Sequence, residues 1–278
     1  MKKRIKKIGF ADVLIHTFLM LASLLMIGTF LILVICSLKP NQDILKFPNG
    51  LTSPNWTFSN YTSVFEKLDL GRATINTFFI TVVKTSLVLY SSAIAAYVLE
   101  KTRFRGRKAL FFAVLCTMMV PGTTLVVPNY NMMTWFGWLN NYAALIVPSI
   151  FKAYGIFLVK QYLEGIPDYF VDAARVDGAS ETLIFHRLML PMMHGALFPL
   201  GIMTVIETWN DFMWPYIILS DRAKFTLPIA LQTLSNQYWN DFSWMLAGVV
   251  ISSIPIFLVY IFGQDKIIEG LAYSGTTG

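Results

Sequence analysis

The sequence has 278 residues, of which 55% are hydrophobic and only 14% are charged, and its mean hydropathy is +0.58. This composition is typical of a membrane protein, so the length rules for soluble domains do not apply. Two cysteines and three histidines are too few for a disulfide framework or a metal cage. The formal net charge of +6 would indicate nucleic acid only if the basic residues shared one face.

Six apolar segments are long enough to cross a bilayer. A spanning helix needs about 20 apolar residues to cross about 30 Å of hydrocarbon. The charge-free stretch 109–151 is too long for one crossing, and its polar, turn-rich centre, PNYNMMTWFGWLNNY, divides it. We therefore predict an all-α integral membrane protein, one domain over 1–278, with spans near 13–37, 73–99, 109–127, 141–162, 191–219 and 243–262.

The distribution of Lys and Arg predicts the side of the membrane on which each loop lies. The apolar run after the basic N-terminus is longer than the roughly 7–15 residues of a signal-peptide core, which favours an uncleaved first span. The loop between spans three and four has no basic residue. Both termini and the 163–190 loop should therefore be cytoplasmic, with 39–72 and 219–242 outside. The basic residues that should face anionic lipid rather than nucleic acid are Lys2, Lys3, Arg4, Lys6, Lys7, Lys101, Arg103, Arg105, Arg107 and Lys108.

The cytoplasmic loop between spans four and five is unusually long and carries its own helix signals. It contains IPDYFVDAARVDGASETLIFHRLMLP. Asp168 can cap a helix that runs to about Val176, and Gly178 can then adopt a left-handed turn. Ser180 can cap a second helix that ends before Pro191. We therefore predict a helix–turn–helix on the inner face of the membrane.

The first helix of this loop has the residues of a docking surface. Ala173 and Ala174 would leave a smooth face, and Tyr169 and Phe170 would supply aromatic anchors, as in helix-in-groove recognition. A self-contained loop with no partner is the alternative that the residues leave open. DNA is a poor partner because phosphate would be repelled by four acidic residues, Asp168, Asp172, Asp177 and Glu181.

The loop resembles the EAA loop in permease subunits of ATP-binding-cassette importers. An acidic-Ala-Ala triplet, a glycine after three more residues and a later Leu-Pro are matched by Asp172, Ala173, Ala174, Gly178, Leu190 and Pro191. Four further stretches resemble maltose-type carbohydrate permeases: RFRGR at 103–107, MVPGTTLVVPNY at 119–130, TWNDFMWP at 208–215 and GLAYSGTTG at 270–278. Two departures are Asp172 in place of the usual glutamate, and Thr276 and Thr277 where relatives commonly carry a basic residue.

This resemblance implies the fold, partners and setting of a type I importer permease. The implied partners are a second homologous permease, two ATPase subunits that bind ATP and Mg, an extracytoplasmic solute-binding protein and a sugar or oligosaccharide. The implied location is a bacterial cell membrane. The resemblance also implies a tail contact with the ATPase, but the basic residue that relatives commonly carry there is missing. The residues implied to couple to the ATPase are Tyr169, Phe170, Asp172, Ala173, Ala174, Asp177, Gly178 and Ser180.

The chain carries no motif for catalysis or for a cofactor of its own. GxxxxGK[ST], HExxH, GxSxG and CxxC are all absent, so ATP would have to be bound by a partner. An intramembrane enzyme therefore has nothing to recommend it. A self-contained secondary transporter is the stronger alternative to the importer, because charged residues occur within the predicted spans.

Three of these charges should lie at similar depth in the membrane. Lys84 and Lys152 each fall near the middle of a predicted span, and Glu207 should lie at a similar depth or slightly farther out. One interpretation is a polar translocation path. The other is a buried ion pair that fixes the packing of the helices.

A second group of path candidates centres on the WND triplet. Trp209, Asn210 and Asp211 combine an aromatic face with amide and carboxylate groups, which suits a carbohydrate. The alternative is a helix kink before Pro215, with the tryptophan in the interfacial aromatic belt. Weaker candidates are Asn76, Asn129 and Tyr130.

Overall fold

The computed structural model describes residues 10–237 and 241–275, and every regular element in this part of the chain is a helix. The prediction of an all-α protein is confirmed. The basic residues 2–7 and the tail residues 276–278 lie outside the described residues.

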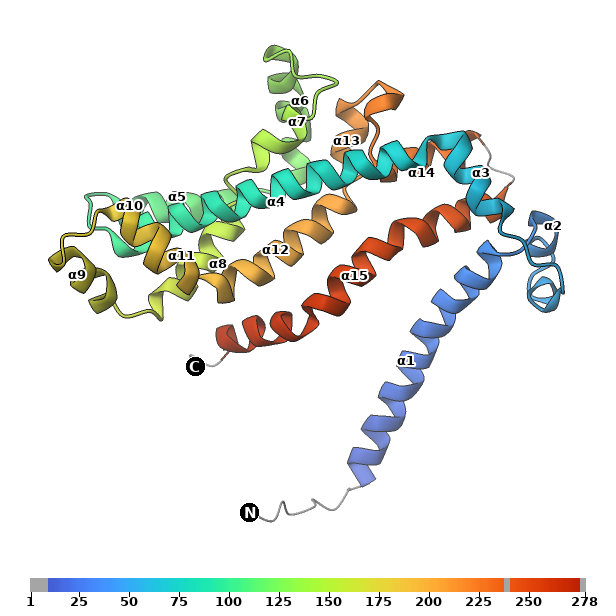
Figure 1. Ribbon diagram of the computed structural model, residues 1–278, viewed down its shortest axis with the longest axis horizontal. Helices are drawn as coiled ribbons and strands as arrows, with labels where there is room; N and C mark the ends of the chain where they lie inside the picture. Colours follow the sequence, from blue (N-terminus) through green and yellow to red (C-terminus); the bar gives the residue numbers. More distant parts are fainter. Residues whose placement is uncertain (1–9, 238–240, 276–278) are drawn as a thin grey trace. The chain divides into compact units, whose positions relative to one another are not determined.

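The elements in Figure 1 are α1 Phe10–Ser37, α2 Asn41–Ile44, η1 Asn49–Thr52, α3 Ser59–Leu68, α4 Leu70–Lys101, α5 Arg107–Met118, η2 Gly122–Leu125, α6 Val126–Trp135, α7 Ala143–Ile146, η3 Val147–Ser149, α8 Ala153–Glu164, α9 Tyr169–Val176, α10 Glu181–Leu183, η4 Ile184–Met189, α11 Leu190–Met192, α12 His194–Trp209, α13 Met213–Ile218, η5 Arg222–Lys224, α14 Leu227–Gln237 and α15 Phe242–Gly275.

Within the described residues, four helices are long and apolar enough to cross a bilayer. They overlap four predicted spans and are Phe10–Ser37, Leu70–Lys101, Ala143–Glu164 and Phe242–Gln264. Two further candidates are helix pairs bent at a short break, Arg107–Met118 with Gly122–Trp135 and Glu181–Met192 with His194–Trp209. The predicted total of six spans therefore requires that each bent pair be one span.

The range predicted as the third span, 109–127, contains a break. α5 ends at Met118, and a bend of 90° separates it from the next helix. Pro121 has no backbone N–H to donate, and Gly122 beside it is a poor helix former. Two short helices at a right angle therefore replace the continuous helix that the apolar run suggests.

The range predicted as the fifth span, 191–219, is divided as well. α12 ends at Trp209, and α13 begins only at Met213. The Asn210 amide donates to a carbonyl one turn back at 2.8 Å, a local bond that competes with continuing the helix. At the other end the helix bends by 73° at Met193, so its straight part begins after Pro191.

The chain forms two compact units, 1–69 with 233–252 and 70–232 with 253–278. Each unit is described by itself, and the single domain over 1–278 stays a prediction.

The smaller unit contains a polar segment after α1 that is held by its own contacts. The buried Lys39 ammonium donates to the Ser53 carbonyl and lies 3.6 Å from the centre of the Trp56 ring. The Asp43 carboxylate accepts from Ser53 Oγ at 2.6 Å and from the Asn55 amide at 3.1 Å. These contacts replace the water that the two charges lose on burial.

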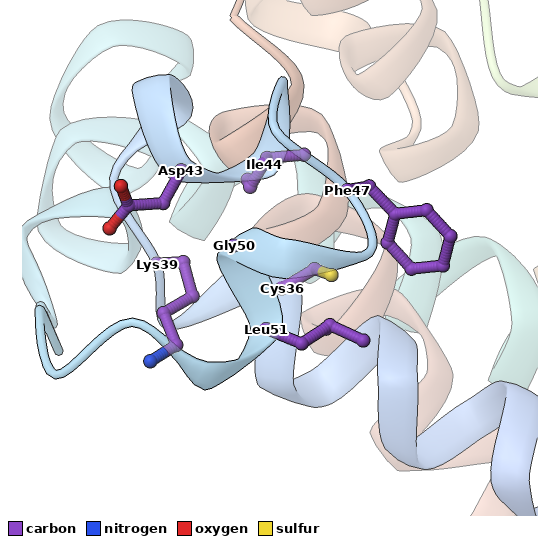
Figure 2. A pocket seen from close by; sticks show the side chains of 7 residues that line it. All are labelled: Cys36, Lys39, Asp43, Ile44, Phe47, Gly50 and Leu51. Carbon is purple, nitrogen blue, oxygen red and sulfur yellow. The ribbon is translucent and has the colours of Figure 1, made fainter.

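Figure 2 shows a small hollow in the same segment, too tight to enclose a water molecule. Its lining consists of Cys36, Lys39, Asp43, Ile44, Phe47, Gly50 and Leu51. A Cβ at Gly50 would lie 1.8 Å from the Asp43 carbonyl oxygen, so the two chain segments meet closely here. Because Lys39 and Asp43 are already bonded to neighbouring groups, the hollow offers no charged group to a ligand.

The larger unit is built on α4, which packs against α8 and α12 (Figure 1). Gly155 on α8 permits the close approach, since a Cβ there would lie 2.5 Å from Ser92 Oγ and 3.1 Å from the Leu200 side chain. α4 is continuous over 32 residues, about 48 Å at 1.5 Å per residue. Its C-terminal end lies beside α9 (Figure 1), and its middle carries Lys84. One continuous helix therefore joins the regions that contain both groups of predicted site residues.

Candidate functional site

The 163–190 loop forms the predicted helix–turn–helix. α9 ends at Val176, Gly178 has a φ of +82°, and Ser180 Oγ accepts from the Leu183 N–H at 3.3 Å. The Gly178 N–H donates to the carbonyl of Arg175, and the next N–H donates to a carbonyl five residues back. This pair of bonds is a Schellman motif, which requires a left-handed residue at the position of Gly178. The predictions for the turn and for the second cap are confirmed.

Asp168 occupies the predicted N-cap position but has a different role. Its side chain makes no capping bond to α9 and instead accepts from Lys101 Nζ at 2.7 Å. An ammonium group is a stronger donor to a carboxylate than a backbone N–H is. The hydrogen bond and charge of Lys101 hold the pKa of the Asp168 carboxyl below its usual value.

The second helix does not end before Pro191, contrary to the prediction. It continues to Met192, and its middle, Ile184–Met189, has π-helical hydrogen bonding. A proline interrupts the regular ladder because it has no N–H, and a π turn is one way in which a helix absorbs such an irregularity. The break comes two residues after Pro191, at the bend of 73°.

The two faces of α9 differ sharply. Val171 is buried, and Ala174 is half-buried against the core of the larger unit. On the other face Tyr169 is 61% exposed, Val176 is 87% exposed, and Ala173 between them is also exposed. The spacing of these three residues gives one outward stripe. Of the two alanines that we predicted as a docking face, only Ala173 therefore faces outward.

The other predicted coupling residues lie next to this stripe, on α9 and in the turn that follows it. The rings of Tyr169 and Phe170 lie 4.0 Å apart, centre to centre. Asp172 is exposed and accepts from Arg175 of its own helix at 3.2 Å. The turn and cap residues Asp177, Gly178 and Ser180 are exposed too.

A second site is the charged cluster, which we define as Lys84, Lys152, Glu207 and Asp211. Lys152, just before α8, forms an ion pair with Glu207 near the end of α12. Lys84 on α4 interacts electrostatically with both acids, and Asp211 follows α12 directly. Segments far apart in the sequence thus bring together two positive and two negative side chains. The ion pair that we considered from the sequence is present, but it is not buried, because the Glu207 side chain is 61% exposed.

The remaining path candidates are placed differently from one another. Asn76 donates to the carbonyls of Ala223 and Phe225, at 3.0 Å each, and so fastens α4 to the 219–226 loop. Trp209 is only 4% exposed, so its ring faces the protein and not a channel. Asn210 is exposed with its amide bonded to its own helix, whereas Asn129 and Tyr130 are half-buried on α6.

Sequence reasoning missed a set of polar contacts between the loop and the end of α4. Tyr97 OH donates to Glu181 at 2.5 Å, and Arg175 donates to Glu181 at 2.6 Å and to the Lys101 carbonyl at 3.0 Å. Lys101 Nζ donates to the Ile166 carbonyl at 2.5 Å, besides its bond to the Asp168 carboxylate. We call these bonds the loop–α4 contacts. Opposite charges on either side of the Gly178 turn were the only sequence signal for them.

Over residues 10–237 and 241–275, the structure contains no group of three or more His, Cys, Asp or Glu side chains that could hold a metal ion.

Comparison with known proteins identifies the family of the chain. Residues 89–269 match the family described as "Binding-protein-dependent transport system inner membrane component". The arabinooligosaccharides transport system permease protein AraQ of Halalkalibacterium halodurans is 34% identical over 251 residues, which are 88% of this chain and 89% of that one. The lactose transport system permease protein LacG of Rhizobium radiobacter is 28% identical over 260 residues, 94% of each chain.

A solved structure supports the same assignment at the level of the fold. One chain of a bacterial ABC transporter involved in the import of the acidic polysaccharide alginate matches with a TM-score of 0.82. The match has 22% identity and covers 95% of this chain and 99% of that chain. The importer-permease fold implied by the sequence resemblance is confirmed. The chain belongs to the family of inner membrane components of binding-protein-dependent transport systems.

Proposed function

We propose that this chain is the membrane-spanning permease subunit of an importer that takes up a sugar or oligosaccharide, and that separate ATPase subunits drive it. The family description and the sugar systems named for its relatives support this. In this proposal the chain lies in a bacterial cell membrane with both termini in the cytoplasm. It pairs with a second, homologous permease, receives its substrate from an extracytoplasmic binding protein, and contacts two ATPase subunits that bind ATP and Mg.

The outward stripe of α9 is the observation that carries the proposal. A short helix with one face packed on the core and the other face exposed can dock in a groove without disturbing its own fold. Ala173 permits close approach, and Tyr169 and Val176 on either side add apolar contact area. Asp172 stays exposed and can pair with a basic residue of the ATPase.

Transport then follows from a shift between two conformations of the permease pair. Nucleotide-driven closure of the ATPases favours one position of the docked α9 helices over the other. Because a ligand shifts an equilibrium by its difference in affinity for the two states, ATP biases the permeases toward one side of the membrane.

The charged cluster gives the proposed path polar groups without net charge. Lys152 and Glu207 neutralise each other, and Lys84 is balanced by the nearby acids. A site of this kind offers hydrogen-bond donors and acceptors to sugar hydroxyls but does not concentrate ions of either sign. We therefore place Glu207 and the half-buried Asp211 along the path, with the two lysines fixing their positions.

Ala173→Arg is expected to release the ATPase while the permease stays folded. The added side chain would project from the outward stripe into the proposed groove, where bulk and positive charge oppose docking. Retention of the ATPase in purified complexes should fall about tenfold or more, as at a central interface residue, and uptake should fall with it. Ala223→Arg, at an exposed position of η5 outside the 163–190 loop, is the control for ATPase retention. Normal ATPase retention and normal uptake in Ala173→Arg would show that the loop is only a connector.

The substrate class can be tested on the partner binding protein. Calorimetry with a panel of neutral oligosaccharides and glycerol-phosphate esters should show binding of a neutral sugar, because the charged cluster has no excess of positive charge for a phosphate. Binding of the esters alone would contradict the sugar assignment and leave the permease assignment intact.

A further inference from the structure

We propose that α4 receives the movement of α9, and that Arg175 is the positioning residue that holds the two helices together. This inference rests on the proposed function, because it assumes that the ATPase acts on α9. It adds to that function the helix through which the movement of α9 passes. α4 is far from the 163–190 loop in the sequence, yet it makes the loop–α4 contacts.

The first step is that the last turn of α4 holds the beginning of α9. Lys101 is the last residue of α4, and its side chain is only 3% exposed. Its ammonium donates to the Ile166 carbonyl and to the Asp168 carboxylate, on either side of Pro167. A buried ammonium is held firmly by such partners, since losing them would leave a desolvated charge.

The second step is that the same turn also holds the end of α9. The Arg175 guanidinium joins three groups, namely Asp172 of α9, Glu181 of α10 and the terminal carbonyl of α4. That carbonyl has no partner within its own helix, so an arginine is a natural cap for it. Tyr97, one turn earlier on α4, donates to the other oxygen of Glu181. Both ends of α9 are therefore fastened to one helix end.

The third step is that a movement of α9 is transmitted better by α4 than by the residues that connect α9 to α12 in the sequence. From α9 toward α12 the chain passes the Gly178 turn, the π-helical residues Ile184–Met189 and the bend of 73°. α4 is continuous, and α8 on the other side of the loop is itself fastened to α4, because Lys160 forms an ion pair with Glu100 at 2.9 Å.

The fourth step is what α4 reaches. Lys84, in its middle, belongs to the charged cluster, and Asn76, near its other end, holds the 219–226 loop. A displacement of α9 that moves α4 therefore changes the surroundings of the proposed path directly. This is a physical route through one rigid element.

Arg175→Gln in the complete transporter, reconstituted with its partner permease, ATPases and binding protein, tests the route. The variant removes the charge that bridges α9, α10 and α4 while leaving the outward stripe intact. We expect the ATPase to stay bound and to hydrolyse ATP, and the number of sugars imported per ATP to fall roughly three- to thirtyfold. Arg187→Gln, an exposed arginine of the π-helical turn, is the matched control and should keep the wild-type ratio.

Tyr97→Phe provides a second and milder test, because it removes only the hydroxyl that binds Glu181. It should lower the same ratio, and adding it to Glu181→Gln should do little further harm, because Glu181→Gln already weakens the Tyr97 bond together with the Arg175 contact. Unchanged import per ATP in Arg175→Gln and Tyr97→Phe would overturn the role of α4. Loss of ATPase binding in Arg175→Gln would also overturn it, by placing Arg175 in the docking surface. If α9 does not dock on the ATPase at all, Ala173→Arg will retain the ATPase normally. That result contradicts the proposed function and is distinct from a failure of the α4 route.

Discussion

Gly178→Val is expected to leave the permease in the membrane at a near-normal level and to lower sugar uptake about tenfold or more. Gly178 has a φ of +82°, a conformation that costs a residue with a side chain about 1–2 kcal/mol. A Cβ at this position meets no other atom within 4 Å, so backbone strain is the only direct effect. That strain is too small to unfold the protein, but relieving it breaks the Schellman motif and would turn α9 away from its proposed docked position.

The measurements are permease level, ATPase retention and uptake in the same membranes. Gly106→Val is a matched control, because Gly106 also has a positive φ of +91° and open space around its Cβ, but lies outside the 163–190 loop. Uptake in the control should stay close to wild type. Equal losses in the two variants would mean that strain anywhere in the protein impairs transport, and that the turn at Gly178 has no special role.

Lys152→Met is expected to reduce the amount of folded permease, and Glu207→Gln should restore part of it. The single change leaves Glu207 without its partner at the charged cluster, whereas the double change removes both charges. The Glu207 side chain is 61% exposed, so we expect Lys152→Met to lower the free energy of unfolding by about 1–2 kcal/mol. This lies between the values for exposed and buried pairs.

Protein level, thermal stability in detergent and uptake should be compared for both single variants and the double variant. Lys108→Met, which removes an exposed lysine outside the cluster, should leave stability unchanged. If Lys152→Met folds normally and only slows uptake, the lysine acts on the substrate and not as the structural partner of Glu207.

The features that the sequence predicted well depend on neighbouring residues. The limits of α9, the left-handed Gly178 and the Ser180 cap follow from local rules of turn and cap chemistry, and the structure has all three. Apolar length also located the four continuous spans. The break at Pro121 was missed because hydropathy averages over a window and gives no weight to a missing N–H.

The features that the sequence could not predict depend on residues far apart. Tyr97 and Glu181 are 84 residues apart, and no periodicity relates them. Asp168 was assigned to a cap because only its neighbours were considered, whereas its partner Lys101 arrives from α4. The pairing of Lys152 with Glu207 was one of the two interpretations that the sequence left open, because both residues were expected at a similar depth in the bilayer, a constraint that soluble proteins lack.

The charged cluster has a consequence for how the chain is inserted into the membrane. During synthesis, Lys84 emerges on α4 long before Glu207 and Asp211 exist. A lone lysine at the centre of a spanning helix costs about 2.5–3.5 kcal/mol at the insertion machinery. In the proposed topology we therefore expect α4 to stay beside that machinery until Glu207 on α12 and Asp211 just after it have been made. The charged cluster would then couple the entry of an early helix into lipid to the arrival of a late one.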